Sequence, residues 1–208
     1  MFLFARSRRM HSGRVPAAME WVVRATEQAR QITGQQIDAW TAVMSPEVGT
    51  VTWTLFAEHL VDIETAGDKL AVDAGFMQSV EESESLFDGP ISDGLATIVH
   101  GTPDLEHPGG YVAVVTATAA NGRLSDAISQ GIDLADAATR IGGQPTVFAV
   151  ANTGEYGNVM WFTASPDIQT LEASEAAVNA DADFLAMVDR IGSSFAPGAM
   201  QSIYRRIL

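Results

Sequence analysis

The sequence predicts an α+β fold built from two copies of one module. Three paired features recur with nearly constant spacing: Gly13-Arg14 with Gly122-Arg123, Gly34-Gln35 with Gly143-Gln144, and Trp53 with Trp161. The offset is 109 residues for the first two pairs and 108 for the tryptophans. A fixed period of this kind is typical of an internal duplication. Each copy is expected to follow the order strand, helix, strand, strand, helix, strand.

The first module is expected to open with a strand at residues 2–8 and a helix at 15–32. The helix is indicated by small and apolar residues spaced three and four positions apart, which share one helix face. These residues are Val15, Ala18, Met19, Val22, Ala25, Ala29 and Ile32. The positions 109 residues later are again small or apolar, so the second module is expected to bury the same helix face.

The remaining elements are read from turn residues and capping residues. Gly34 and Gly143 are expected to end the long helices, because glycine readily adopts the positive φ found after a helix C-terminus. Asp73 and Asp181 are expected to begin helices, because a carboxylate there accepts free backbone N–H groups. Middle strands are expected at 37–44, 50–56, 146–150 and 158–162, and closing strands at 95–100 and 201–207. The remaining helical segments are expected at 63–72, 73–84, 168–179 and 181–191.

Proline and paired glycines divide the chain into two domains. Residues 101–110 contain Pro103, Pro108 and Gly109-Gly110, a composition typical of a connection between domains. The expected division is therefore a first module at 1–100, a linker at 101–110 and a second module at 111–208.

Composition excludes several classes of function. The net charge of −14 and the pI near 4.4 disfavour nucleic acid and anionic membranes as partners. The absence of cysteine excludes disulfides, zinc–thiolate sites, iron–sulfur clusters and a thiol nucleophile. No apolar run reaches transmembrane length, and three arginines within the first nine residues argue against a signal peptide. The protein is expected to be cytoplasmic.

The residues around the two tryptophans carry a resemblance to a known superfamily. The stretch Val51-Thr52-Trp53-Thr54-Leu55-Phe56-Ala57-Glu58, followed by Ala66, Leu70 and Phe76-Met77, resembles antibiotic-biosynthesis monooxygenase and NIPSNAP-like domains of the dimeric α/β-barrel superfamily. The stretch Met160-Trp161-Phe162-Thr163, followed by Leu171, Val178 and Phe184-Leu185, repeats the pattern. The resemblance implies two tandem ferredoxin-like βαββαβ modules forming one intramolecular α/β-barrel.

The resemblance also implies the range of functions. It suggests a small-molecule-binding protein, with cofactor-independent monooxygenation or isomerisation of an aromatic or polyketide-like compound as the activity. A non-catalytic assembly or binding protein and a haem-binding protein are the alternatives. The sequence leaves open whether the chain is an enzyme.

Five residues are candidates for ligand binding. Trp53 and Trp161 stand at equivalent strand positions, where they either line paired pockets or serve as core aromatics. Arg6, Arg8 and Arg205 lie on first and last strands and would stabilise an anionic or enolate-bearing ligand if these strands come together. Their alternative role is that of solvated strand ends. The expected ligand is accordingly a small apolar or anionic compound.

Two histidines are weak catalytic candidates. His59 follows the Trp53 strand and His100 lies on a closing strand, and either is a conceivable axial ligand for haem. Neither has a histidine counterpart in the second module, where Asp167 and Leu208 occupy the equivalent positions. No clustered His/Asp/Glu motif is present, so neither a metal nor an obligatory cofactor is predicted.

Self-association is predicted from a strand edge. Residues 96–99, Ala-Thr-Ile-Val, carry no charge and favour β-structure, and an unprotected edge strand invites pairing with another chain. A homo-oligomer is therefore expected.

Overall fold

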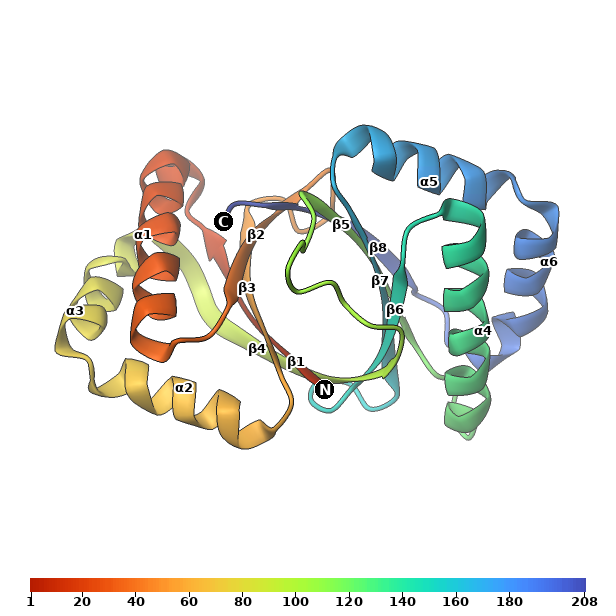
Figure 1. The fold of residues 1–208 in the computed structure, drawn as a ribbon, viewed down its shortest axis with the longest axis horizontal. Coiled ribbons are helices and arrows are strands. Elements are labelled where there is room, and N and C mark those ends of the chain that lie inside the picture. Colours follow the sequence, from red (N-terminus) through yellow and green to blue (C-terminus); the bar gives the residue numbers. More distant parts are fainter. The chain divides into compact units, whose positions relative to one another are not determined.

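The expected alternation of strands and helices is present in a computed structural model, which describes residues 1–208 (Figure 1). The strands are β1 (Phe2–Met10), β2 (Ile37–Val43), β3 (Thr50–Ala57), β4 (Phe87–His100), β5 (Tyr111–Thr118), β6 (Thr146–Ala151), β7 (Asn158–Ser165) and β8 (Met200–Arg206). The helices are α1 (Val15–Thr33), α2 (Leu60–Val72), α3 (Ala74–Glu82), α4 (Leu124–Gly142), α5 (Ile168–Ala180) and α6 (Ala182–Ile191). Three short 3₁₀ turns precede α1, β4 and the segment that leads to β8.

The eight strands follow a hydrogen-bonded order that closes into a barrel, β1-β3-β2-β8-β5-β7-β6-β4. The α+β class and the barrel expected from the sequence are thereby confirmed. Within each half of the sequence, the first strand pairs antiparallel with the third and the third with the second.

The chain divides into two compact units, which are described separately. Unit 1 comprises Met1–Leu95 and Arg205–Leu208, and unit 2 comprises Ala96–Tyr204. The division falls within β4 and β8 and not at residues 101–110, so each of these two strands contributes residues to both units.

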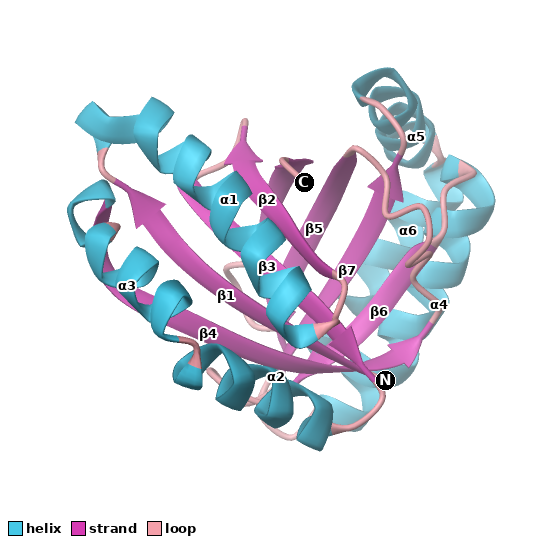
Figure 2. Ribbon diagram, turned by 60° about the vertical axis from the view of Figure 1, so that its left-hand side comes forward, coloured by secondary structure: helices cyan, strands magenta, loops and turns pink.

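In unit 1, helices α1, α2 and α3 cover one face of the β1–β3 sheet (Figure 2). We call this the helix-covered face. Its core contains Ala18, Val22 and Ala25 of α1 packed with Val51 of β3. Side chains alternate along β3, since Thr52 and Thr54 point to the opposite face, where their hydroxyls form hydrogen bonds with Ser7 and Trp40.

Unit 2 repeats this arrangement with α4, α5 and α6 on the helix-covered face of β5–β7. Phe148 and Val159 are fully buried there and pack with Ala135 of α4. The apolar spacing that predicted α1 thus also forms α4.

The capping residues are where the sequence places them. Gly34 and Gly143 adopt φ of 74° and 71° at the ends of α1 and α4. Asp73 Oδ1 accepts a hydrogen bond from Phe76 N at 2.7 Å, and Asp181 Oδ1 accepts one from Phe184 N at 2.8 Å. Each aspartate therefore begins the third helix of its half of the sequence.

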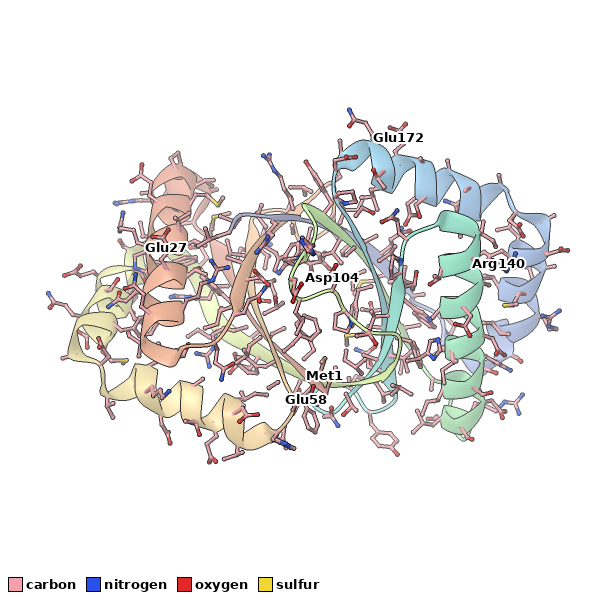
Figure 3. All side chains as sticks on the ribbon, in the orientation of Figure 1. Met1, Glu27, Glu58, Asp104, Arg140 and Glu172 are labelled. Carbon is pink, nitrogen blue, oxygen red and sulfur yellow. The ribbon has the colours of Figure 1, made fainter.

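The ammonium group of Met1 lies near an exposed carboxylate. The ammonium nitrogen of Met1 lies 3.9 Å from Glu58 Oε2, and Figure 3 shows the two residues beside each other. A surface ion pair of this length contributes little to stability.

The strand edge that predicted self-association is paired within the chain. Ala96, Thr97 and Ile98 of β4 pair with Ala151, Val150 and Ala149 of β6. The expectation of a free edge at 96–99 is therefore wrong, because β6 already satisfies the backbone groups of this segment. A homo-oligomer stays a prediction, without this edge as its basis. No helix combines the length and apolar character needed to cross a membrane.

Candidate functional site

The candidate site lies in unit 1, on the helix-covered face beside β1. Arg6 is the cross-strand partner of Trp53, so these two candidate residues stand next to each other on the sheet. Trp53 Nε1 donates to Thr26 Oγ1 at 2.9 Å, and that hydroxyl donates to Val22 O at 2.6 Å. This relay fixes the indole plane against α1.

Two further aromatic rings complete a cluster around Trp53. Trp21 meets Trp53 edge to face, with ring centroids 6.2 Å apart, and Phe87 lies 5.4 Å from Trp21 and 6.4 Å from Trp53. Such geometries are favoured beyond simple area burial. We call Trp21, Trp53 and Phe87 the aromatic cluster.

Arg6 and Arg8 of β1 flank the aromatic cluster in different electrostatic states. Arg6 donates from Nε and Nη2 to the two carboxylate oxygens of Asp93, each at 2.7 Å, and these hydrogen bonds raise the pKa of Arg6 above its usual value. The Arg8 guanidinium stacks over the Phe87 ring at 4.5 Å. Desolvation by burial lowers the pKa of Arg8, with the nearby charge of Glu84 opposing the shift.

Apolar side chains that are only partly buried border this region. They pack against the core cluster that contains Leu55 and Ala66, and come from β1, β3, α2 and α3: Phe4, Trp53, Ile63, Leu70 and Phe76. Partly exposed aromatic and aliphatic groups next to arginines can contact a flat apolar compound that carries a negative charge.

The strand of unit 2 equivalent to β1 is β5, and it carries none of the charged and aromatic side chains that β1 contributes to the candidate site. The positions of Phe4, Arg6 and Arg8 are held by Ala113, Val115 and Ala117, and the register confirms the equivalence because Val115 pairs with Trp161. The change converts a charged face into an apolar one.

Unit 2 also differs at its middle strand β6, where Phe148 is buried on the helix-covered face. It stands where unit 1 has Ala39, and it packs against Trp161 with ring centroids 5.1 Å apart. The helix residue opposite is Gly131 where unit 1 has Val22, and a Cβ on Gly131 would lie 2.4 Å from Phe148 Cζ. Unit 1 therefore has the larger residue on the helix and the smaller one on the strand, whereas unit 2 has the smaller residue on the helix and the larger one on the strand.

The two candidate tryptophans are consequently held in different ways. Ala135 replaces Thr26, and without that hydroxyl Trp161 Nε1 donates directly to Gly131 O at 2.8 Å. Trp161 is 9% exposed and takes part in the buried core of unit 2. The structure brings Arg6, Arg8 and Trp53 together and leaves Trp161 in a packed interior.

Arg205 does not join the other two candidate arginines. It is exposed on β8, and β3 and β2 separate β8 from β1 in the strand order. Arg205 therefore does not stand on a strand next to the one that carries Arg6 and Arg8.

The neighbouring Arg206 makes a contact that sequence reasoning missed. Its Nη2 donates to Asp38 Oδ1 at 2.6 Å, and Arg30 Nη2 donates to the same oxygen at 3.2 Å. The Asp38 side chain is only 5% exposed. A buried aspartate in a strand was the available signal, because such a group needs a cationic partner.

The two candidate histidines take part in hydrogen bonds that belong to the fold. His59 is exposed at the N-terminus of α2, and its backbone N–H donates to Asp62 Oδ2 at 3.1 Å. His100 Nε2 lies 2.7 Å from Asp136 Oδ1, which links the end of β4 to α4. Glu27, the residue of α1 equivalent to Asp136, stands on the solvent side of its helix (Figure 3).

These surroundings do not fit the axial ligand that haem would need. His59 lies in no apolar enclosure, and the Nε2 atom of His100 is already engaged by a carboxylate. No group of three or more His, Asp or Glu side chains could hold a metal ion.

The chain has the fold of an α/β-barrel protein. No protein-family model matches the sequence, and no curated protein matches it. Solved structures match it over nearly its whole length, as the resemblance implied.

Three of these structures illustrate the likeness. A candidate monooxygenase from Fusobacterium nucleatum superposes with a TM-score of 0.70 at 6% identity, covering 100% of this chain and 92% of its own. An anthrone oxidase-like protein gives 0.65 at 11% identity, covering 99% and 90%. A mutant chlorite dismutase from Candidatus Nitrospira defluvii gives 0.56 at 10% identity, covering 99% and 91%. The likeness establishes a shared fold, and the activities named belong to those proteins.

Proposed function

We propose that this chain is a small-molecule-binding α/β-barrel protein made of two tandem ferredoxin-like modules, of which one keeps a ligand site. Support for the modules comes from the strand orders β4-β1-β3-β2 and β8-β5-β7-β6, which repeat in the two halves. We retain residues 1–100 and 111–208 as the duplicated segments, joined by 101–110.

The observation that carries the proposal is the divergence between the two helix-covered faces. β1 carries Phe4, Arg6 and Arg8 at the positions where β5 carries Ala113, Val115 and Ala117. On the other side of the tryptophan strand, unit 2 has the buried Phe148 where unit 1 has Ala39. Packing alone does not require two arginines beside an aromatic cluster, since unit 2 packs without them. The site is therefore assigned to unit 1 and the ligand to flat aromatic compounds.

A neutral aromatic probe tests this assignment. Titration of 15N-labelled protein with 2-naphthamide is expected to shift amide resonances of β1, β3, α2 and α3. Phe4→Ala should weaken the binding, because it removes an aromatic contact at the border of the site. Tyr156→Ala is the matched control, since Tyr156 is an aromatic residue of unit 2 that is 87% exposed. Shifts confined to unit 2, or none at millimolar probe, would contradict the proposal.

Oxygenation of the bound compound without a cofactor is the second candidate function. It is favoured by the names of two structures that share the fold, a candidate monooxygenase and an anthrone oxidase-like protein. Anthrone is the natural probe: its methylene group would take up one O₂ and become a ketone with release of one water.

We expect oxygen uptake to equal the anthraquinone formed and to exceed the rate in buffer. Trp53→Phe should lower the rate, because it breaks the hydrogen bond that orients the ring at the site. Tyr156→Ala should leave the rate unchanged. Uptake at the buffer rate would assign the protein to the non-catalytic alternative.

A further inference from the structure

Arg8 lies beside the aromatic cluster with its Nε unpaired. Its guanidinium stacks on Phe87 at 4.5 Å, yet its Nε is enclosed and has no hydrogen-bond partner. Buried N–H groups are rarely left unpaired, because the lost hydration is not replaced. The contact with Phe87 accounts for the position of the guanidinium. Because Arg8 is only partly buried while its Nε is enclosed, the Nη groups are the part of the side chain that an acceptor can approach.

Arg6 shows what this side chain does on the same strand face. Two residues before Arg8, it uses Nε and Nη2 to hold both oxygens of Asp93 at 2.7 Å. By strand alternation, the residues of β4 between Phe87 and Asp93 on this face are Gly89 and Ile91. Neither side chain can accept a hydrogen bond, so β4 supplies a carboxylate to Arg6 and none to Arg8.

We propose that Arg8 binds the carboxylate of an aromatic carboxylic acid through its two Nη groups, a two-pronged contact like the one that Arg6 makes with Asp93 through Nε and Nη2. This inference rests on the proposed function and names the substrate class of that site. The aromatic part of the ligand lies against the partly exposed side chains of Phe4, Trp53 and Phe76.

The surroundings of Arg8 favour a carboxylate over other anions. Two parallel N–H groups match the two oxygens of a carboxylate, whereas a phenolate or enolate offers one oxygen. A phosphate dianion would meet the field of Glu84 and of a chain with net charge −14. A carboxylate has two oxygens for the two N–H groups, and its single negative charge is repelled less than a dianion.

Calorimetric titration with 2-naphthoate and 2-naphthamide tests the proposal, because the two probes share a ring system and differ in charge. We expect naphthoate to bind at least about tenfold more tightly, as a charge-assisted bidentate contact requires. Arg8→Gln should abolish this difference and leave naphthamide binding intact. Arg8→Lys should restore only part of it, because an ammonium lacks the paired planar N–H groups.

Arg9→Gln is the matched control. Arg9 is exposed, lies next to Arg8 on β1 and points to the other face, so both affinities should stay as in the unaltered protein. Equal binding of both probes to the unaltered protein would overturn the role of Arg8 and leave the aromatic site standing. Loss of naphthamide binding in Arg8→Gln would show that Arg8 only supports the fold. Failure of both probes to bind the unaltered protein would overturn the proposed function itself.

Discussion

Replacing Phe148 with alanine is expected to lower the free energy of unfolding by about 3–5 kcal/mol, the range for removing a large buried aromatic side chain. Phe148 is fully buried and packs on Trp161 between β6 and α4. No neighbouring side chain can collapse into the space easily, because the residue opposite is Gly131. Urea denaturation followed by circular dichroism measures the change.

The reciprocal substitution isolates the coupling between helix and strand. Gly131→Val places a side chain where even a Cβ would approach Phe148 Cζ to 2.4 Å, so we expect a loss on the order of 1–3 kcal/mol from overpacking. The double variant Gly131→Val with Phe148→Ala reproduces the Val22 and Ala39 arrangement of unit 1. It should therefore lose less stability than the two single variants together.

A double-mutant cycle tests whether residues 131 and 148 are energetically coupled. Residues in direct contact couple by about 0.5–3 kcal/mol, whereas independent residues add to within about 0.5 kcal/mol. Additive losses would mean that Gly131 and Phe148 are unrelated changes, and the contrast between the two helix-covered faces would lose its physical basis. Tyr156→Ala, at an exposed position of the same unit, should change stability by no more than about 0.5 kcal/mol.

Local rules in the sequence were sufficient for most of the fold. The spacing of Ala18, Val22 and Ala25 predicted the buried face of α1, and Asp73 and Asp181 predicted helix starts that the structure confirms. These signals depend on contacts within a few residues, which sequence spacing alone determines. The 109-residue offset then extended the prediction from one half of the chain to the other.

The closing strand of the first half shows where local rules fail. The sequence predicted a strand at 95–100, whereas β4 runs over Phe87–His100. Asp88, Pro90 and Gly94 disfavour a strand by intrinsic propensity. Pairing within the sheet overrides that preference, since β4 lies next to β1 in the strand order.

The candidate site was predictable only in part for the same reason. Strand alternation could place Arg6 and Arg8 on one face, and the register then sets Arg6 beside Trp53. The ring beneath Arg8 belongs to Phe87, which lies outside every element predicted from the sequence. His59 was a candidate because it follows the Trp53 strand, whereas the structure places it at the start of α2, where its backbone N–H donates to Asp62.

The sequence could indicate that Asp38 needs a cationic partner but not that Arg206 supplies it, because 168 residues separate the two. It ties the last residues of the chain into unit 1. Ile207 N donates to Ala39 O at 2.7 Å and Ala39 N donates to Leu208 O at 3.1 Å, immediately beside this ion pair. Asp38 therefore stands at the point where the chain end joins β2.

Asp38→Ala is expected to lower the free energy of unfolding by about 3–5 kcal/mol, because removing one partner of a buried ion pair leaves charge without compensation. Here two arginines share one carboxylate that is 5% exposed, so both Arg30 and Arg206 lose their acceptor. Arg206→Ala should cost less, since Arg30 still neutralises Asp38.

Asp93→Ala provides the matched control for Asp38. It also removes a carboxylate from an arginine, but both side chains of the Arg6–Asp93 pair are nearly half exposed, and such pairs contribute about 0–1 kcal/mol. Amide hydrogen exchange at Ala39 and Ile207 locates the effect: Asp38→Ala should accelerate both amides and Asp93→Ala neither. Equal losses in the two variants would show that Asp38 behaves as a surface carboxylate. An unchanged Ile207 amide in Asp38→Ala would show that the backbone bonds alone hold the chain end.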